Sequence, residues 1–184
     1  MDQVFQNAFR PPRPVILGRQ LHPLSLGHLV LLESGGCIFT DPAPMRPANA
    51  GDLAAAVWVC SQKATDLRMA DNAPQDKEMI RWGLQMRKRD LRVERCAFID
   101  YLTTSLRFPK AWETDNNKKP VSAWQFAVAS ALIESGVAHG DVWDMPVSEA
   151  LALYAAVQER KGLELMTPEE QKAVDAINQK AKPA

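Results

Sequence analysis

The sequence lacks the long apolar runs that membrane proteins carry. No stretch of its 184 residues approaches the roughly 18 consecutive apolar residues that predict a membrane span. Its first residues, Met1-Asp2-Gln3, have none of the features of a signal peptide. We therefore expect a soluble, unexported protein that works in the cytoplasm and has no membrane partner.

Cysteine is scarce and poorly placed for disulfide bonds. The chain has 3 cysteines, which lie far apart and form no CxxC motif. An odd number cannot pair off within one chain, so we expect a reducing compartment. We predict that Cys37, Cys60 and Cys96 are all small buried hydrophobic residues.

Histidine is equally rare, with 3 residues in the chain. His22 and His28 are separated by six positions, whereas helical ligand pairs have i, i+3 or i, i+4 spacing. We therefore predict no metal site. Instead, His28 is expected on the flank of a short helix, with a hydrogen bond to a nearby carbonyl.

Other motifs of catalysis and cofactor binding are also missing. Neither GxxxxGK[ST] nor GxGxxG occurs, and Gly35-Gly36 follows a predicted helix rather than preceding one. Asp141 and Asp144 flank Trp143 at a corner between helices, where we interpret them as helix caps and not as an acid–base pair. The sequence thus predicts no catalytic residue, no cofactor and no enzyme.

There is no excess of charge of either sign, because 22 Lys and Arg balance 22 Asp and Glu. This balance argues against affinity for nucleic acid or anionic membrane through net charge. One run, residues 81–95, is locally basic. If the run forms one helix, four of its basic residues lie within about 60° of one another and form a basic stripe. We interpret this stripe as a solvated face or a match for an acidic partner rather than a phosphate-binding surface. The stripe consists of Arg81, Lys88, Arg92 and Arg95.

Hydrophobic periodicity predicts a mainly helical single domain of about six or seven helices over residues 15–162. Residues 15–24 are the one place where we expect β structure, as a short extended segment or hairpin. Ser25 is a good cap for a leucine-rich helix that Gly35-Gly36 ends. Asn49 or Asp52 should cap a helix over 53–61.

Three further helical stretches have clear boundaries. Residues 74–106 predict one long helix or two with a bend, with apolar stripes on two sides. Ser122 and Gln125 have capping-box spacing for a helix over 123–134. Thr167 and Glu170 have the same spacing ahead of a polar helix.

The two ends of the chain are predicted to lie apart from this domain. Residues 1–14 indicate an N-terminal arm, in which Phe5 and Phe9 could share one face of a helical turn. The arm is either a poorly ordered terminus or an extension that docks on a partner or a neighbouring subunit. Residues 163–184 predict a peripheral C-terminal helix and tail.

Two stretches resemble known proteins. Leu21–Glu33 (LHPLSLGHLVLLE) is similar to the opening of phage tail assembly chaperones, where a strand pair leads through an L-x-P-L-[ST] turn into a leucine-rich helix. Ser122–Ala129 (SAWQFAVA) and Val142–Leu151 (VWDMPVSEAL) resemble the later part of proteins encoded beside the tape-measure gene of phages and prophages.

The resemblance implies a small protein of the host cytoplasm that binds the tape-measure protein, recruits tail-tube subunits and is absent from the finished virion. Such a protein needs an apolar groove with a charged rim. The resemblance does not decide whether the chain also forms a homo-oligomer. Our candidate groove residues are those least explained by internal packing, although ordinary core is the alternative for each. They are Met79, Trp82, Met86 and Trp112.

Three other functions remain open. A virion structural protein, such as a connector, tail-completion or decoration subunit, would grip its neighbours with Phe5, Phe9 and the proline-rich segment. A small nucleic-acid-binding regulator would use the basic stripe. The last alternative is a bacterial helical adaptor unrelated to phage.

Overall fold

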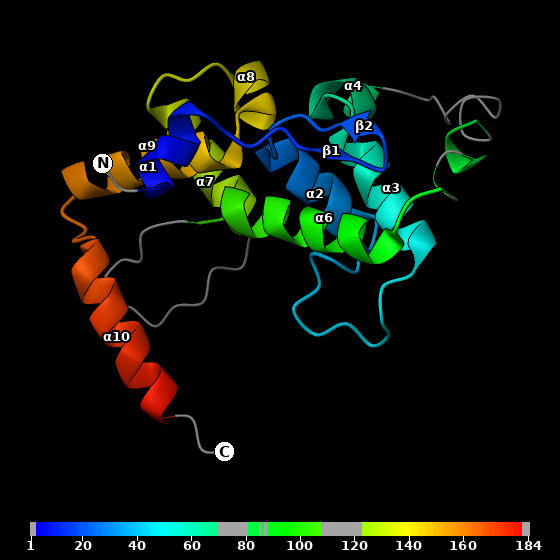
Figure 1. Ribbon diagram of the computed structural model, residues 1–184. Coiled ribbons are helices and arrows are strands. Elements are labelled where there is room, and N and C mark those ends of the chain that lie inside the picture. The colour runs from blue at the N-terminus through cyan, green and yellow to red at the C-terminus, as the bar shows by residue number, and fades with distance from the viewer. Residues whose placement is uncertain (1–2, 70–80, 85, 87, 108–122, 182–184) are drawn as a thin grey trace.

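The computed structural model describes residues 3–69, 81–84, 86, 88–107 and 123–181. It is a mainly helical single domain with a small two-stranded hairpin near the N-terminus, which confirms the predicted fold class (Figure 1). Six of the helices in these ranges have nine residues or more. The elements are α1 (Gln3–Phe9), β1 (Val15–Ile16), β2 (Arg19–Gln20), α2 (Leu26–Ser34), α3 (Ala50–Cys60), α4 (Ala64–Met69), α6 (Leu91–Ser105), α7 (Trp124–Glu134), α8 (His139–Asp144), α9 (Val147–Arg160) and α10 (Pro168–Ala181).

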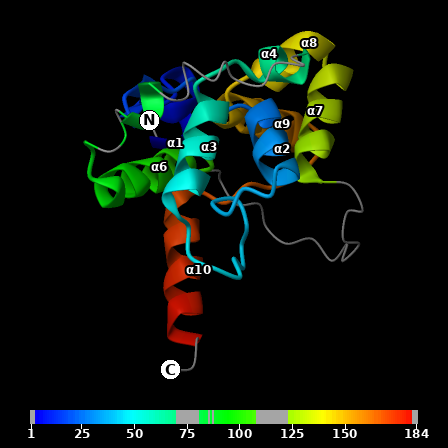
Figure 2. The ribbon, with the colours of Figure 1, turned by 90° about the vertical axis from the view of Figure 1, so that its right-hand side faces the viewer.

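The leucine-rich helix α2 lies at the centre of the fold. It contacts α3, α4, α7 and α8, and Figure 2 shows it between α3 and α7. As predicted, Ser25 caps its N-terminus and Gly35 follows its last residue. The backbone N–H of Val147 donates to the carbonyl of Leu24 at 2.7 Å, which ties the turn before α2 to the start of α9. Apolar residues of α2 are therefore buried on more than one side.

The hairpin turns through Leu17 and Gly18, whose φ angles are 49° and 78°. Positive φ at both positions is the requirement of a type I′ turn, and it is costly for leucine. Leu17 is fully buried, and its N–H donates to Glu94 Oε2 at 2.8 Å. Trp82 Nε1 donates to the Leu17 carbonyl, also at 2.8 Å. Burial and these two hydrogen bonds offset the strain and fix the hairpin against α6.

Residues 74–106 were predicted to form one long helix or two with a bend, and the structure agrees with the second alternative, because the helix is interrupted at residues 88–90. Asp90 caps the new helix α6, accepting hydrogen bonds from the N–H groups of Arg92 and Val93 at 2.9 and 3.4 Å. Beyond the break, Phe98 and Leu102 are buried as the stripe predicts. Residues 70–80, which include the predicted start of the helix, lie outside the described residues.

The N-terminal arm forms α1 and packs against α9 of its own chain. Ser148 Oγ donates to the carbonyl of Asn7 at 3.0 Å, and Asn7 Nδ2 donates to the carbonyl of Thr104 at 3.3 Å. The part of the arm that forms α1 is thus held by the domain itself. The two expectations for it, poor order and docking on a partner, did not include this intramolecular contact.

At the other end, α10 extends away from the remaining helices in both views (Figures 1 and 2). The predicted capping box is present: Thr167 Oγ1 accepts from the Glu170 N–H at 3.3 Å, and Glu170 Oε2 accepts from the Thr167 N–H at 2.8 Å. Ile177 is 65% exposed. The helix α10 is therefore peripheral.

Two other predictions were wrong. Ala123 is the N-cap of α7, without a side-chain cap bond, and Gln125 is buried instead of capping the helix, while Ser122 lies outside the described residues. Cys96 is exposed on α6 and Cys37 is half-buried, so only Cys60 is the buried hydrophobic residue that we expected. In the described parts of the chain, none of the helices has both the length and the apolar content that crossing a membrane requires.

Candidate protein-binding face

The structure scatters the apolar residues predicted to contact a partner. Trp82 is only 3% exposed, and Met86 is half-buried against the same core. Phe9 is 79% exposed at the end of α1, the helix that also contains Phe5. Trp82 is therefore a core residue that anchors the hairpin, which is the alternative the sequence left open. Met79 and Trp112 lie outside the described residues.

The predicted basic stripe does not lie on one continuous helix. Arg81 precedes the break at 88–90 and Lys88 lies within it, whereas Arg92 and Arg95 belong to α6. All four side chains are exposed. Arg92 and Arg95 border a hollow beside the N-terminus of α3, while Lys88 borders a different hollow beside Gly18. The single helical wheel failed because the capped break at Asp90 changes the helical phase.

An apolar pocket of about 140 Å³ opens beside α2. Phe126 of α7 and Trp143 of α8 form one wall, with their rings edge to face and 5.3 Å between centroids. Trp143 is 8% exposed, whereas Phe126 is 49% exposed and available to a partner. The opposite wall is supplied by three residues of α2: Gly27, Val30 and Leu31.

Gly27 sets how closely α2 approaches its neighbours. A Cβ atom at this position would lie 2.7 Å from the Ala64 Cβ and 2.8 Å from the Trp143 carbonyl oxygen. Contacts this short are not tolerated in folded proteins, so only glycine allows α2 to pack here against α4 and α8. The position of Trp143 in the pocket wall depends on this close approach.

A second apolar pocket, of about 150 Å³, lies on the other side of Leu31. It is formed where the C-terminal end of α2 packs against α3. We call the two pockets and the exposed edges of Leu31 and Phe126 the two-pocket face. The second pocket is lined by Leu31, Leu32, Gly35, Gly36, Cys37, Asp52, Ala55, Ala56 and Val59.

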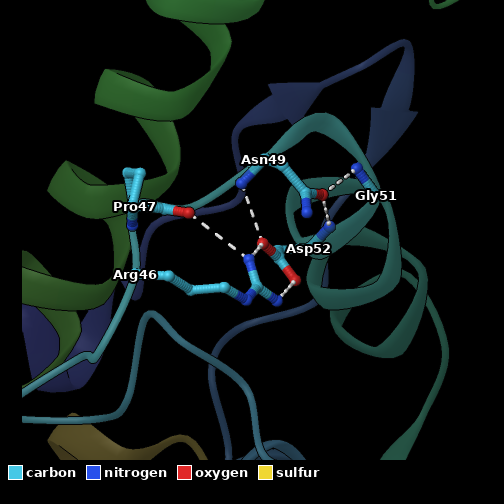
Figure 3. A network of polar contacts seen from close by, with 5 residues as sticks. All are labelled: Arg46, Pro47, Asn49, Gly51 and Asp52. Carbon is cyan, nitrogen blue, oxygen red and sulfur yellow. Dashed lines mark hydrogen bonds and ion pairs between the residues drawn. The ribbon is translucent and has the colours of Figure 1, made fainter.

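The rim of the second pocket holds an ion pair at the N-terminus of α3 (Figure 3). Asn49 Oδ1 accepts from the Gly51 and Asp52 N–H groups at 2.8 and 3.0 Å. Arg46 donates to both carboxylate oxygens of Asp52, at 2.6 and 2.7 Å. The hydrogen bonds from Arg46, with one from the Asn49 N–H, lower the pKa of Asp52 to about 2. The carboxylate is therefore ionised, and Arg46 largely balances its charge.

His28 fixes the buried end of α2. Its Nε2 donates to the Gln62 carbonyl at 2.8 Å, which confirms the predicted bond to a carbonyl. With that tautomer, Nδ1 accepts from the Ser25 N–H at 3.2 Å and completes a capping box. Burial lowers the pKa of His28, although the Gln62 carbonyl opposes the shift. The imidazole therefore works in its neutral form.

Polar groups near the face hold helices together. Asp144 accepts hydrogen bonds from the N–H and the hydroxyl of Thr65, and so caps α4. We predicted that Asp144 caps a helix, but we expected a helix adjacent to Asp144 in the sequence and not the distant α4. Gln125 Nε2 donates to Glu33 Oε1 at 2.6 Å and links α7 to α2. Among the described residues, no group of three or more His, Cys, Asp or Glu side chains is placed to share a metal ion.

This arrangement can accept large apolar side chains from another molecule. Sequence reasoning missed Val30, Leu31, Phe126 and Trp143, because the pattern along one helix does not show which apolar side chains a distant helix leaves uncovered. The one available signal was Gly27, a glycine inside a leucine-rich helix, which indicates close helix packing. Comparison of the chain with protein-family models, curated protein sequences and solved structures gave no match.

Proposed function

We propose that this chain is a non-enzymatic protein-binding factor of phage tail assembly, which holds a helical segment of the tape-measure protein on the two-pocket face. The observation that carries the proposal is the pair of apolar pockets on either side of Leu31. Half-exposed Phe126 extends this apolar surface toward solvent.

The size of the pockets fits this role. An apolar cavity of about 150 Å³ accommodates a benzene molecule, so each pocket has room for one large apolar side chain. Amphipathic helices bind in this manner, with anchors at i, i+3, i+4 and i+7 that enter an apolar groove. Each anchor contributes about 25 cal/mol for every Å² of apolar surface that it removes from water.

The resemblance to tail assembly chaperones supports the same face. The similar stretch Leu21–Glu33 contains α2 almost entirely, while Ser122–Ala129 and Val142–Leu151 contain Phe126 and Trp143. The segments that resemble the family are therefore those that build the first pocket.

Co-expression with the tape-measure protein of the same phage tests the proposal. The native chain should keep the tape-measure protein in the soluble fraction and copurify with it. Leu31→Arg should abolish both effects, because it places a charge between the pockets. Leu153→Arg is the matched control, since Leu153 is 42% exposed on α9 and lines neither pocket. Equal copurification of the two variants would overturn the proposal.

A second candidate function is a virion structural subunit. The projecting helix α10, with Ile177 65% exposed, favours it, because such a helix suits contact with a neighbouring subunit. Mass spectrometry of purified particles separates the two functions. Abundant peptides of this chain in mature virions would support the structural subunit, and their absence would support the chaperone.

A further inference from the structure

The charge of this neutral chain is unevenly distributed over its helices. The four helices that form the two-pocket face, α2, α3, α7 and α8, contain no lysine or arginine. Their acidic residues outnumber the basic ones five to none. These residues are Glu33, Asp52, Glu134, Asp141 and Asp144.

Three of these carboxylates are exposed and form no ion pair with the described residues: Glu33, Glu134 and Asp141. Asp52 is balanced by Arg46, which comes from the loop before α3, and Asp144 caps α4. Glu33 lies two residues after Leu31, and the other two are on the helices that supply Phe126 and Trp143. Charges within about 10 Å act on one another at physiological salt, so an occupant held close to these carboxylates is exposed to a negative potential.

We infer that the segment held on the two-pocket face is a basic amphipathic helix, with lysine or arginine beside its apolar stripe. The inference rests on the proposed function and specifies the chemistry of the partner. Apolar anchors would enter the two pockets, and the flanking cations would face the carboxylates of α2, α7 and α8. Such rim charges govern the rate of association and its salt dependence more than the final affinity.

A second copy of this chain is the competing occupant. Its helix α6 exposes Ile99 (46%) on the face that carries Arg92 and Arg95, and the C-cap residue Leu106 (38%) follows on the same side. However, α6 is fixed in its own domain through buried Phe98, so a second copy could bind only as a whole domain. A separate helix has no such steric constraint.

Two synthetic peptides of 18 residues provide the probe. They share one leucine stripe and differ only in flanking residues, which are lysine in one and glutamate in the other. Fluorescence anisotropy should show that the full chain binds the lysine peptide about tenfold more tightly at low salt. The difference should close in about 0.5 M salt, where screening is strong.

Three sets of variants locate the effect. Leu31→Arg should abolish binding of the lysine peptide, while the control Leu153→Arg should keep its affinity within about twofold. A triple variant, Glu33→Gln, Glu134→Gln and Asp141→Asn, should keep binding but lose the preference for lysine. The amide oxygen introduced at position 33 can still accept the bond from Gln125, and circular dichroism verifies that each variant is folded.

The outcomes separate this inference from the proposed function. Equal, Leu31-dependent binding of both peptides would overturn the basic partner and leave the docking face intact. Failure of both peptides to bind would overturn the inference. The proposed function is tested separately, by copurification of the tape-measure protein. Sedimentation that shows an oligomer, converted to monomers by Arg92→Glu with Arg95→Glu, would assign the face to a second copy.

Discussion

The two-pocket face and the basic region at residues 81–95 show opposite uses of apolar and charged residues. Around α2, apolar side chains remain partly uncovered, and the four helices that form the face contain acidic residues but no lysine or arginine. In the basic region, Trp82 is buried in the protein's own core while arginine side chains face solvent. The comparison teaches that residue type alone does not identify a binding surface. A surface binds where the chain leaves apolar area that its own packing does not cover.

The largest expected change in the free energy of unfolding is at Trp82, in the basic region. Trp82→Ala should lower the free energy of unfolding by about 3–5 kcal/mol, because it removes a buried aromatic side chain. It also leaves the Leu17 carbonyl without the hydrogen bond from Nε1. Urea denaturation measures the change. The control Phe9→Ala, at a 79% exposed aromatic, should change stability by less than about 0.5 kcal/mol. If the Trp82→Ala protein were as stable as the native chain and had lost only partner binding, Trp82 would be a partner-binding residue and not a core residue.

Gly27→Ala tests the two-pocket face. The added methyl group meets Ala64 and the Trp143 carbonyl, so the helices must separate at a cost of about 1–3 kcal/mol. Thermal unfolding measures this loss, and peptide binding should weaken as the pocket wall moves. Gly140→Ala is the matched control, because a Cβ there has nothing within 4 Å. Similar stability of the two variants would show that α2 does not depend on the close approach.

His28 makes the stability of the face depend on pH. Burial holds the pKa of the folded state below the ordinary value of 6.5, so the unfolded chain binds more protons between these two values. Stability is therefore fully present above pH 6.5 and decreases as the pH falls toward the folded pKa. Denaturant unfolding at several pH values measures this slope. His28→Gln should reduce the slope, whereas His139→Gln, at an exposed histidine, should retain it.

The smallest effect is expected for the basic side chains of α6. Arg92→Ala with Arg95→Ala should change the free energy of unfolding by less than about 0.5 kcal/mol, because both side chains are exposed. The pair should also leave binding of the lysine peptide unchanged. A loss of stability greater than about 1 kcal/mol, measured by urea denaturation, would show that the basic region has a structural role.

Local signals in the sequence predicted several helix ends correctly. Ser25 and the Thr167–Glu170 pair cap their helices through contacts between residues three apart. The predicted turn at Gly35-Gly36 also forms, because glycine readily adopts the φ of 66° found at Gly36. These features depend on near neighbours in the chain, which is why the sequence was sufficient to predict them.

The incorrect predictions depend on distant contacts. Gln125, which was expected to cap its own helix, instead donates to Glu33, 92 positions away in the sequence. The apolar pattern of residues 74–106 continues through the cap at Asp90, so it does not distinguish one long helix from two with a bend. The same limit applies to the binding face, since Leu31 and Phe126 are 95 positions apart along the chain.

By itself, the amino-acid sequence determined that this chain is helical, where most helices end and that its total charge is zero. Those properties follow from short-range hydrogen bonding, backbone geometry and composition. Only the tertiary structure decided which apolar side chains stay uncovered and that the acidic helices gather around them. Helix packing decides both, because the partner that covers each side chain comes from a distant part of the chain.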